Sequence, residues 1–173
     1  AAVDPDDDTL IIYRELYQKG LTGEDLAERM TAYEVDDAYS IGGVLDGAAW
    51  NRTGYTGPTI GETLVRAGHK LRPADKNRLA GKIQIHERLK LNKIDGRPKM
   101  QIFNSCPHLI RELQTIPVDK TRPEDVDTKA PDHAYDALRY LIMSRPRSIP
   151  QDSMFEFKRN LDTAPISDEI FGY

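Results

Sequence analysis

The chain contains a single cysteine, Cys106, in 173 residues. One cysteine cannot form an internal disulfide framework, and it excludes a zinc site built from several cysteines. The sequence also lacks any apolar run that approaches the roughly 20 residues of a membrane-spanning helix. No signal peptide is recognisable at its start. We therefore expect a cytosolic protein with no membrane segment.

The scarcity of aromatic residues and the lack of a phosphate-binding motif each make one class of function less expected. Aromatic residues make up 8% of the chain, and few of them lie in its most basic part, so stacking on nucleic-acid bases is not indicated. The phosphate-binding motif G-x-x-x-x-G-K-[ST] does not occur, so an ATPase motor of that type is not expected within these residues. Hydrophobic residues at 39% and charged residues at 30% are typical of a globular domain. The length suits one domain with a core of its own.

The net charge of −4 conceals a strongly basic segment. Residues 66–111 contain twelve Lys or Arg and three acids, a net charge of +9, so the remainder of the chain carries −13. A basic segment in an acidic chain favours contact with the phosphate backbone of nucleic acid. A solvated helix face with ordinary lysines explains the same composition, and the sequence leaves both alternatives open.

Strand-like and helix-like segments alternate along the chain. Short runs rich in apolar and β-branched residues predict strands, and amphipathic segments with caps or helix stops predict helices. This alternation predicts an α/β fold with a mixed central sheet flanked by helices. The expected strands cover residues 9–17, 40–46, 69–73 and 100–103, and the expected helices cover residues 22–33, 59–68, 77–91, 107–116 and 132–144.

The last expected helix carries the strongest candidate site. Its apolar residues recur on one face, and Asp132, His133 and Asp136 fall together on the opposite face at its N-terminal end. Carboxylate oxygens suit Mg²⁺ or Mn²⁺, and imidazole tolerates the softer of these two ions. In the alternative interpretation, Asp132 is an N-cap and the acids only favour the positive end of the helix dipole.

A second candidate acid, Asp46, ends the apolar run at residues 40–46. This run predicts a buried strand, and α/β sheets bind their ligands at the carboxyl ends of such strands. We expect the carboxylates of Asp46 and Asp136 to meet there, roughly 8 Å or less apart. Because facing carboxylates repel, at least one of the two should have a raised pKa when no ion is bound. Alternatively, Asp46 only caps the loop that follows.

Four segments together resemble a known family. They are Leu45-Asp46-Gly47, residues 70–91, residues 97–103 and the motif from Asp132 to Tyr140 that contains Asp-Ala-Leu-Arg-Tyr. In this order they resemble the C-terminal nuclease domain of the large terminase subunit of tailed bacteriophages, over roughly residues 9–145. The resemblance implies an RNase H-like fold for residues 1–145, a C-terminal tail at residues 146–173, and a viral protein that acts in the cytoplasm of the infected bacterium.

The resemblance also implies the chemistry of the site. Asp46 and Asp136 match two acids of the family that bind a pair of Mg²⁺ or Mn²⁺ ions and cut double-stranded DNA by two-metal hydrolysis. His133 matches a histidine of some members, and Asp132 is an additional acid. The family's first acid is expected on a strand before residue 1, so we expect this chain to be N-terminally incomplete and to cut DNA weakly or not at all. The residues expected to grip phosphates lie in the basic segment: Lys70, Lys76, Arg78, Lys82, Arg97 and Lys99.

The partners implied by the resemblance are double-stranded DNA, an ATPase domain in the same parent chain, the small terminase subunit and the portal. Two other functions fit the same residues. One is another RNase H-like nuclease of the resolvase or transposase type, which shares the acids. The other is a non-catalytic DNA-binding or assembly module, which the missing first strand makes a serious alternative.

Overall fold

A computed structural model describes residues 1–37, 42–52, 56–93, 95–122, 124–127 and 129–145. The described part is a mixed α/β structure with five α-helices and two small sheets. The expected tail at residues 146–173 lies outside the described residues. The elements in chain order are β1 (Ala2–Val3), β2 (Leu10–Ile12), α1 (Gly23–Glu34), β3 (Gly42–Leu45), a 3₁₀ helix (Gly47–Trp50), α2 (Ile60–Arg66), β4 (Lys70–Pro73), α3 (Arg78–Leu89), β5 (Met100–Ile102), α4 (Pro107–Thr115) and α5 (His133–Ser144).

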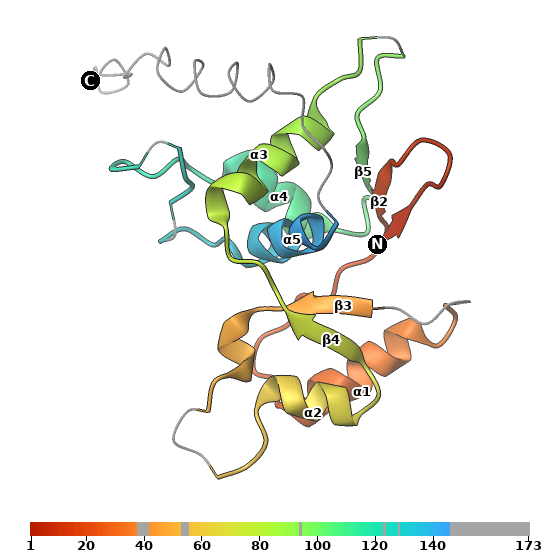
Figure 1. The fold of residues 1–173 in the computed structure, drawn as a ribbon, viewed down its shortest axis with the longest axis vertical. Coiled ribbons are helices and arrows are strands. Elements are labelled where there is room, and N and C mark those ends of the chain that lie inside the picture. The colour runs from red at the N-terminus through yellow and green to blue at the C-terminus, as the bar shows by residue number, and fades with distance from the viewer. Residues whose placement is uncertain (38–41, 53–55, 94, 123, 128, 146–173) are drawn as a thin grey trace.

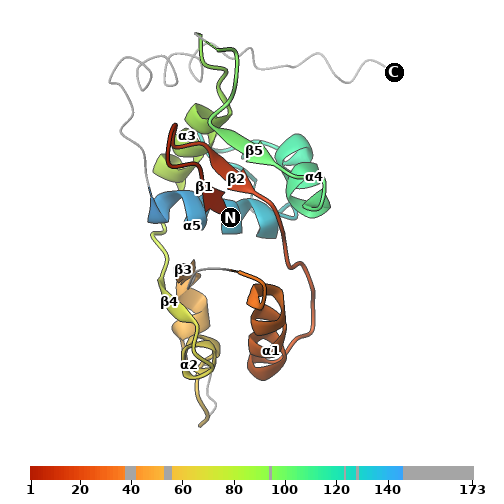
Figure 2. The same cartoon turned by 90° about the vertical axis from the view of Figure 1, so that its right-hand side faces the viewer.

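The α/β class is confirmed, but the strands do not form the single central sheet that we expected. Among the described residues, β1, β2 and β5 form one sheet, in which β1 is antiparallel to β2 and β2 is parallel to β5. Strands β3 and β4 form a separate parallel pair. The two sheets lie on opposite sides of α5 (Figures 1 and 2).

Strand β2 is much shorter than expected because the side chains that follow it bind elsewhere. The Arg14 guanidinium bonds the carbonyl oxygen of Tyr33 at the end of α1 and the carboxylate of Asp37. The Glu15 carboxylate accepts the backbone N–H groups of residues 108 and 109 at 2.8 and 3.0 Å, which caps the start of α4. The chain therefore leaves the sheet after Ile12.

The α5 region, which comprises the described parts of residues 1–13 and 78–145, holds the main core. Helices α3, α4 and α5 pack beside the three-stranded sheet (Figure 2). Gly81 on α3 allows the close crossing with α5, because a Cβ at this position would collide with the Arg139 side chain. The buried apolar residues of this region are Leu10, Ile12, Ile85, Met100, Cys106, Leu109, Val126, Tyr135, Leu138 and Ile142.

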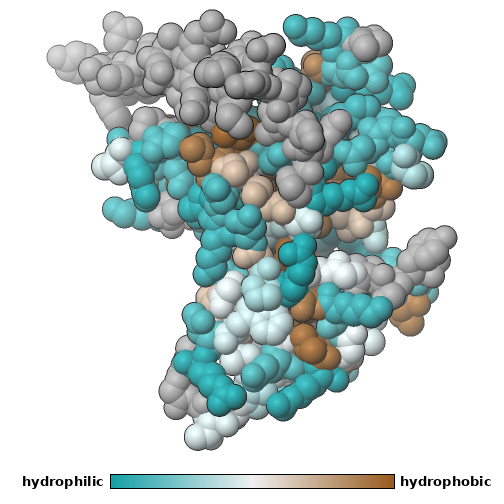
Figure 3. All heavy atoms as spheres, viewed as in Figure 1, coloured by the Kyte–Doolittle hydropathy of each residue, from teal (hydrophilic) through white to brown (hydrophobic). Residues whose placement is uncertain are grey.

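The β3 region, which comprises the described parts of residues 21–73, is smaller and more polar. Helices α1 and α2 pack together beside β3 and β4 (Figure 1). Both helices begin with a capping box, in which Thr22 pairs with Asp25 and Thr59 pairs with Glu62. Leu64 is fully buried here. Among the residues coloured in Figure 3, hydrophilic ones are spread over both regions, with small hydrophobic patches between them.

Helix α5 joins the two regions. It packs against β3, and the Tyr140 hydroxyl donates a hydrogen bond to the Asp46 carboxylate at 2.7 Å. At its end, the Arg72 guanidinium of β4 lies 3.4 Å from the carbonyl oxygen of Ser144. None of the helices in the described ranges combines the length and apolar character that crossing a membrane requires.

Candidate metal and DNA site

Asp46 lies directly after β3 and its carboxylate is held by several donors. One oxygen accepts the backbone N–H of Ala48 at 2.8 Å, so Asp46 caps the 3₁₀ helix. The other oxygen accepts the Tyr140 hydroxyl at 2.7 Å. The ammonium of Lys76 lies 3.8 Å from the first oxygen. Gly47 makes room for this lysine, because a Cβ there would lie 2.7 Å from the Lys76 Cε atom.

These contacts lower the pKa of Asp46, whereas repulsion between two facing carboxylates would raise it. The hydrogen bond from the Ala48 backbone and then that from Tyr140 lower the pKa of the Asp46 carboxyl. The pKa of Tyr140 is raised to about 12 by burial and by its bond to Asp46. The rise in pKa that was expected for at least one of the two acids is therefore not found at Asp46, whose carboxylate is satisfied by donors.

Asp136 lies on the first turn of α5, one turn before Tyr140. Its Oδ1 atom is 3.0 Å from Nη2 of Arg139, and its Oδ2 atom is 3.6 Å from Nη1 of Arg78. The Arg139 guanidinium also stacks over the Tyr140 ring, 4.5 Å from its centroid. Residues four apart on a helix share a face. The structure therefore brings Asp46, through Tyr140, to the face of α5 that carries Asp136.

Asp125 also belongs to the cluster of charged side chains around Asp136, although the sequence did not reveal it. Its Oδ2 atom accepts the Nε–H of Arg78 at 2.8 Å, and its side chain is 13% exposed. Burial opposes ionisation, but the hydrogen bond from Arg78 lowers the pKa of Asp125 below its usual value. The neighbouring Val126 is buried in the main core and fixes this segment. An acid in an irregular connection has no periodic signal, so only the fold could place it.

Asp132 is the N-cap residue of α5, but its side chain makes no capping hydrogen bond. The buried Glu112 of α4 accepts the backbone N–H groups of Ala134 and Tyr135 at 2.8 and 2.9 Å instead. Burial, and then the charge of Asp136, raise the pKa of Asp132. The geometry therefore does not favour the interpretation of Asp132 as a simple side-chain cap.

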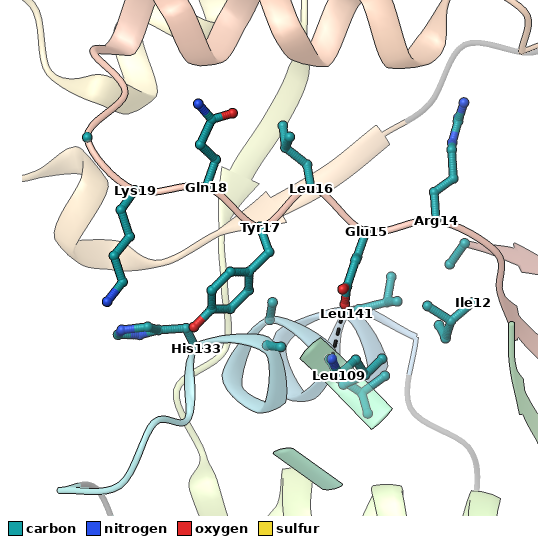
Figure 4. Close-up of a pocket in the computed structure, with 15 residues that line it drawn as sticks. Ile12, Arg14, Glu15, Leu16, Tyr17, Gln18, Lys19, Leu109, His133 and Leu141 are labelled. Carbon is teal, nitrogen blue, oxygen red and sulfur yellow. Dashed lines mark hydrogen bonds between the residues drawn. The ribbon is translucent and has the colours of Figure 1, made fainter. Parts of the chain in front are cut away.

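His133 lies apart from the cluster around Asp136. Its side chain is 71% exposed, and its Nδ1 atom is 4.0 Å from an oxygen of Asp132. It lies beside Tyr17, whose ring stacks on His108 at 4.1 Å between centroids. Figure 4 shows His133 next to Tyr17 at the rim of a pocket of about 620 Å³ between α5 and residues 12–20.

The six residues that were expected to grip phosphates do not form one surface. Lys70, Lys76 and Arg97 are exposed. The Lys99 ammonium is bound to Asp7 at 2.7 Å and its side chain is 17% exposed. Lys82 is 6% exposed, and burial lowers the pKa of its amine. A buried lysine does not reach a DNA backbone, so the expectation for Lys82 does not fit the fold.

The donor types of the cluster fit a divalent cation, since carboxylate oxygen is the preferred ligand of Mg²⁺ and Mn²⁺. However, too few of these side chains lie close enough together to hold a metal ion. Within the described ranges, no three His, Cys, Asp or Glu side chains are arranged to hold one metal ion. Both oxygens of Asp136 face guanidinium groups. By themselves, the described residues therefore do not form a metal site.

Comparison with known proteins adds no relative: no family model, curated protein or solved structure matches the chain.

Proposed function

We propose that this chain is part of a metal-dependent DNA endonuclease, the nuclease domain of a viral DNA-packaging terminase, with an RNase H-like fold. One observation carries the proposal. The Tyr140 hydroxyl holds the Asp46 carboxylate at 2.7 Å, one helical turn from Asp136 on α5. Tyr140 thereby links two acids that lie 90 residues apart in the sequence.

In this proposal Asp46 and Asp136 hold Mg²⁺ or Mn²⁺, and an acid from a strand upstream of residue 1 completes the ligand set. Two bound ions would supply an activated water and stabilise the leaving oxygen of the DNA strand. His133 is a less direct candidate, because it faces the pocket beside Tyr17.

Exposed cations support DNA as the substrate, and one of them lies beside Asp46. Lys76 lies 3.8 Å from Asp46 and its side chain is 63% exposed, so it can contact a phosphate next to the acids. Lys70 and Arg97 are also exposed. Such contacts bind the backbone without reading its sequence. The ATPase domain, the small terminase subunit, the portal and the cytoplasm of the infected cell belong to the same proposal.

Cleavage of supercoiled plasmid in Mn²⁺ tests the proposal. The variants are Asp46→Asn and Asp136→Asn, which keep the shape of each side chain and remove its charge, and Asp36→Asn is the matched control on an exposed acid. We expect weak cleavage by this chain, much stronger cleavage by a parent chain with its upstream strand, and loss of cleavage in both site variants only. Equal cleavage by the wild type and both site variants would refute the assignment.

A non-catalytic DNA-binding module is the second candidate, favoured by the guanidinium groups that already neutralise Asp136. It predicts that the parent chain binds DNA without cutting it in Mg²⁺ or Mn²⁺. A resolvase-type nuclease would instead cut branched DNA in preference to plasmid. The same assay with a four-way junction as the substrate separates these outcomes.

A further inference from the structure

A pocket beside α5 is separate from the acids of the proposed site. It has a volume of about 620 Å³ and lies between α5 and residues 12–20, which lead from β2 to α1 (Figure 4). The residues of α5 that line it are Ala134, Ala137, Leu138 and Leu141, together with His133 at its rim. Asp136 and Tyr140 project from a different face of the same helix.

The apolar walls of this pocket are recessed. Ile12, Leu109 and Leu138 are buried. Among the described residues, none of the large hydrophobic side chains that are exposed lines the pocket. Partner proteins bind to contiguous exposed apolar patches, whereas small molecules bind in concave apolar pockets of roughly 300–1,000 Å³. The shape and size of the pocket therefore favour a small molecule.

Polar groups gather at one end of the pocket. The Lys19 ammonium, the His133 ring and the Tyr17 hydroxyl lie at this end (Figure 4), and the rings of Tyr17 and His133 are 6.5 Å apart between centroids. The Nδ1 atom of His133 is 4.0 Å from the Asp132 carboxylate. Lys19 is exposed and forms no ion pair with any acid in the described ranges. Its charge is thus available to an anion.

The other charged groups of the pocket are already engaged. Glu15 is the only acid among the described residues that line it, and its oxygens accept the backbone N–H groups of residues 108 and 109 and contact the His108 ring. The Arg14 guanidinium is bound to Asp37 and points away from α5 (Figure 4). Burial lowers the pKa of the Ala1 amine. The positive charge that remains is therefore greatest at the Lys19 end.

We propose that this pocket binds a small organic anion with an apolar body, an aliphatic carboxylate of medium length. Its carboxylate pairs with Lys19 and accepts hydrogen bonds from His133 and Tyr17. Its chain lies along α5 from Ala134 to Leu141, a distance of about 10 Å. A bound chain also holds residues 12–20 against α5. The inference does not depend on nuclease activity.

Titration calorimetry with decanoate, below its micelle-forming concentration, tests the inference. Ala137 lines the pocket and is exposed, so Ala137→Leu fills the space with a good helix former. We expect this variant to bind decanoate at least tenfold more weakly than the wild type. Lys19→Gln should weaken binding several-fold. Lys120→Gln, at an exposed lysine that does not line the pocket, should bind like the wild type.

Two other probes separate the apolar contact from the charge. Each buried methylene raises affinity about fourfold, so hexanoate should bind at least tenfold more weakly than decanoate. Decylamine, which has a similar chain and the opposite charge, should also bind more weakly. Absence of decanoate binding, equal binding by the wild type and Ala137→Leu, or equal binding of decylamine would overturn the inference. Ala137→Gln, with the same expected loss, takes the place of Ala137→Leu if that variant does not fold.

Discussion

The α5 region and the β3 region are stabilised in different ways. The α5 region buries ten apolar or sulfur-containing residues in one cluster. In the β3 region, the buried apolar residues among those described are Ala27 and Leu64, and Thr59 and His69 are buried with them. His69 is held by polar contacts, with its Nε2 atom 3.3 Å from the carbonyl oxygen of Ala27 and its Nδ1 atom 3.3 Å from Glu34.

This difference bears on the proposed site, because each region supplies one of its two acids. Asp136 is fixed by the well-packed helix α5, whereas Asp46 belongs to the region with the smaller core. The Tyr140 hydroxyl and the packing of α5 on β3 connect them. The position of Asp46 therefore depends on contacts with the α5 region as much as on contacts within the β3 region.

The largest effects are expected from truncating one core residue in each region. Leu138→Ala should lower the free energy of unfolding by about 3 kcal/mol and reduce amide-exchange protection in both regions. Leu64→Ala should remove protection from α1 and α2 and leave α4 and α5 protected. Denaturant unfolding and hydrogen exchange measure both. Equal loss of protection throughout the Leu64→Ala variant would show that the regions form one cooperative unit.

A somewhat smaller effect is expected from Gly81→Ala in the α5 region. The added methyl group collides with Arg139, and overpacking of this kind costs about 1–3 kcal/mol. Gly42→Ala in β3 is the matched control, because its Cβ would meet only the Lys70 carbonyl oxygen at 3.9 Å. Thermal unfolding should show a clear decrease for Gly81→Ala and little change for Gly42→Ala. The reverse order would mean that the tight contact lies in the β3 region.

The salt dependence of DNA binding tests whether the β3 side of the site contacts phosphates. Neutralising Lys70 and Lys76 together should reduce the slope of log affinity against log salt by up to about 1.8, since each phosphate contact contributes about 0.9. Exposed Arg29 and Lys19, outside the basic segment, provide the charge-matched control pair. An unchanged slope for the Lys70 and Lys76 pair would identify this face as an ordinary solvated surface.

The smallest effect concerns the turn between β1 and β2. The hydrogen bond from Lys99 lowers the pKa of Asp7 to about 2. Because the folded-state pKa lies below the unfolded value, this contact stabilises the fold above about pH 4, and the contribution is lost as the pH falls through about 2. Lys99→Met should return the pKa of Asp7 toward its ordinary value in a carboxyl NMR titration. An unchanged titration would show that Lys99 does not bind Asp7 in solution and remains available for phosphate.

Local signals in the sequence predicted the helices well, whereas β2 is much shorter than expected. Thr22 and Thr59 each precede an acid by three residues, and both pairs form the expected helix starts. The apolar periodicity of residues 134–142 likewise identified α5. These features depend on residues within one or two helical turns of each other, so a short stretch of sequence is enough to predict them.

The remaining features depend on contacts between distant segments. Glu112 replaces Asp132 as the cap of α5 from 22 residues away. Arg78 pairs with Asp125 across 47 positions, which turned an expected phosphate-binding residue into an ion-pair partner. The burial of Lys82 follows from the close packing of α3 on α5. Such pairings join residues that are far apart in the sequence, so neither periodicity nor spacing predicts them.

The central claim is that Asp46 and Asp136 share a divalent cation, and paramagnetic broadening by Mn²⁺ tests it most directly. In an NMR titration of the amide signals, one binding event should broaden residues 46–48 and residues 136–137 together, at the same Mn²⁺ concentration. Asp136→Asn should remove the broadening from both segments. Broadening that is confined to the acidic turn at residues 4–8, or that affects the two segments at different Mn²⁺ concentrations, would contradict the claim.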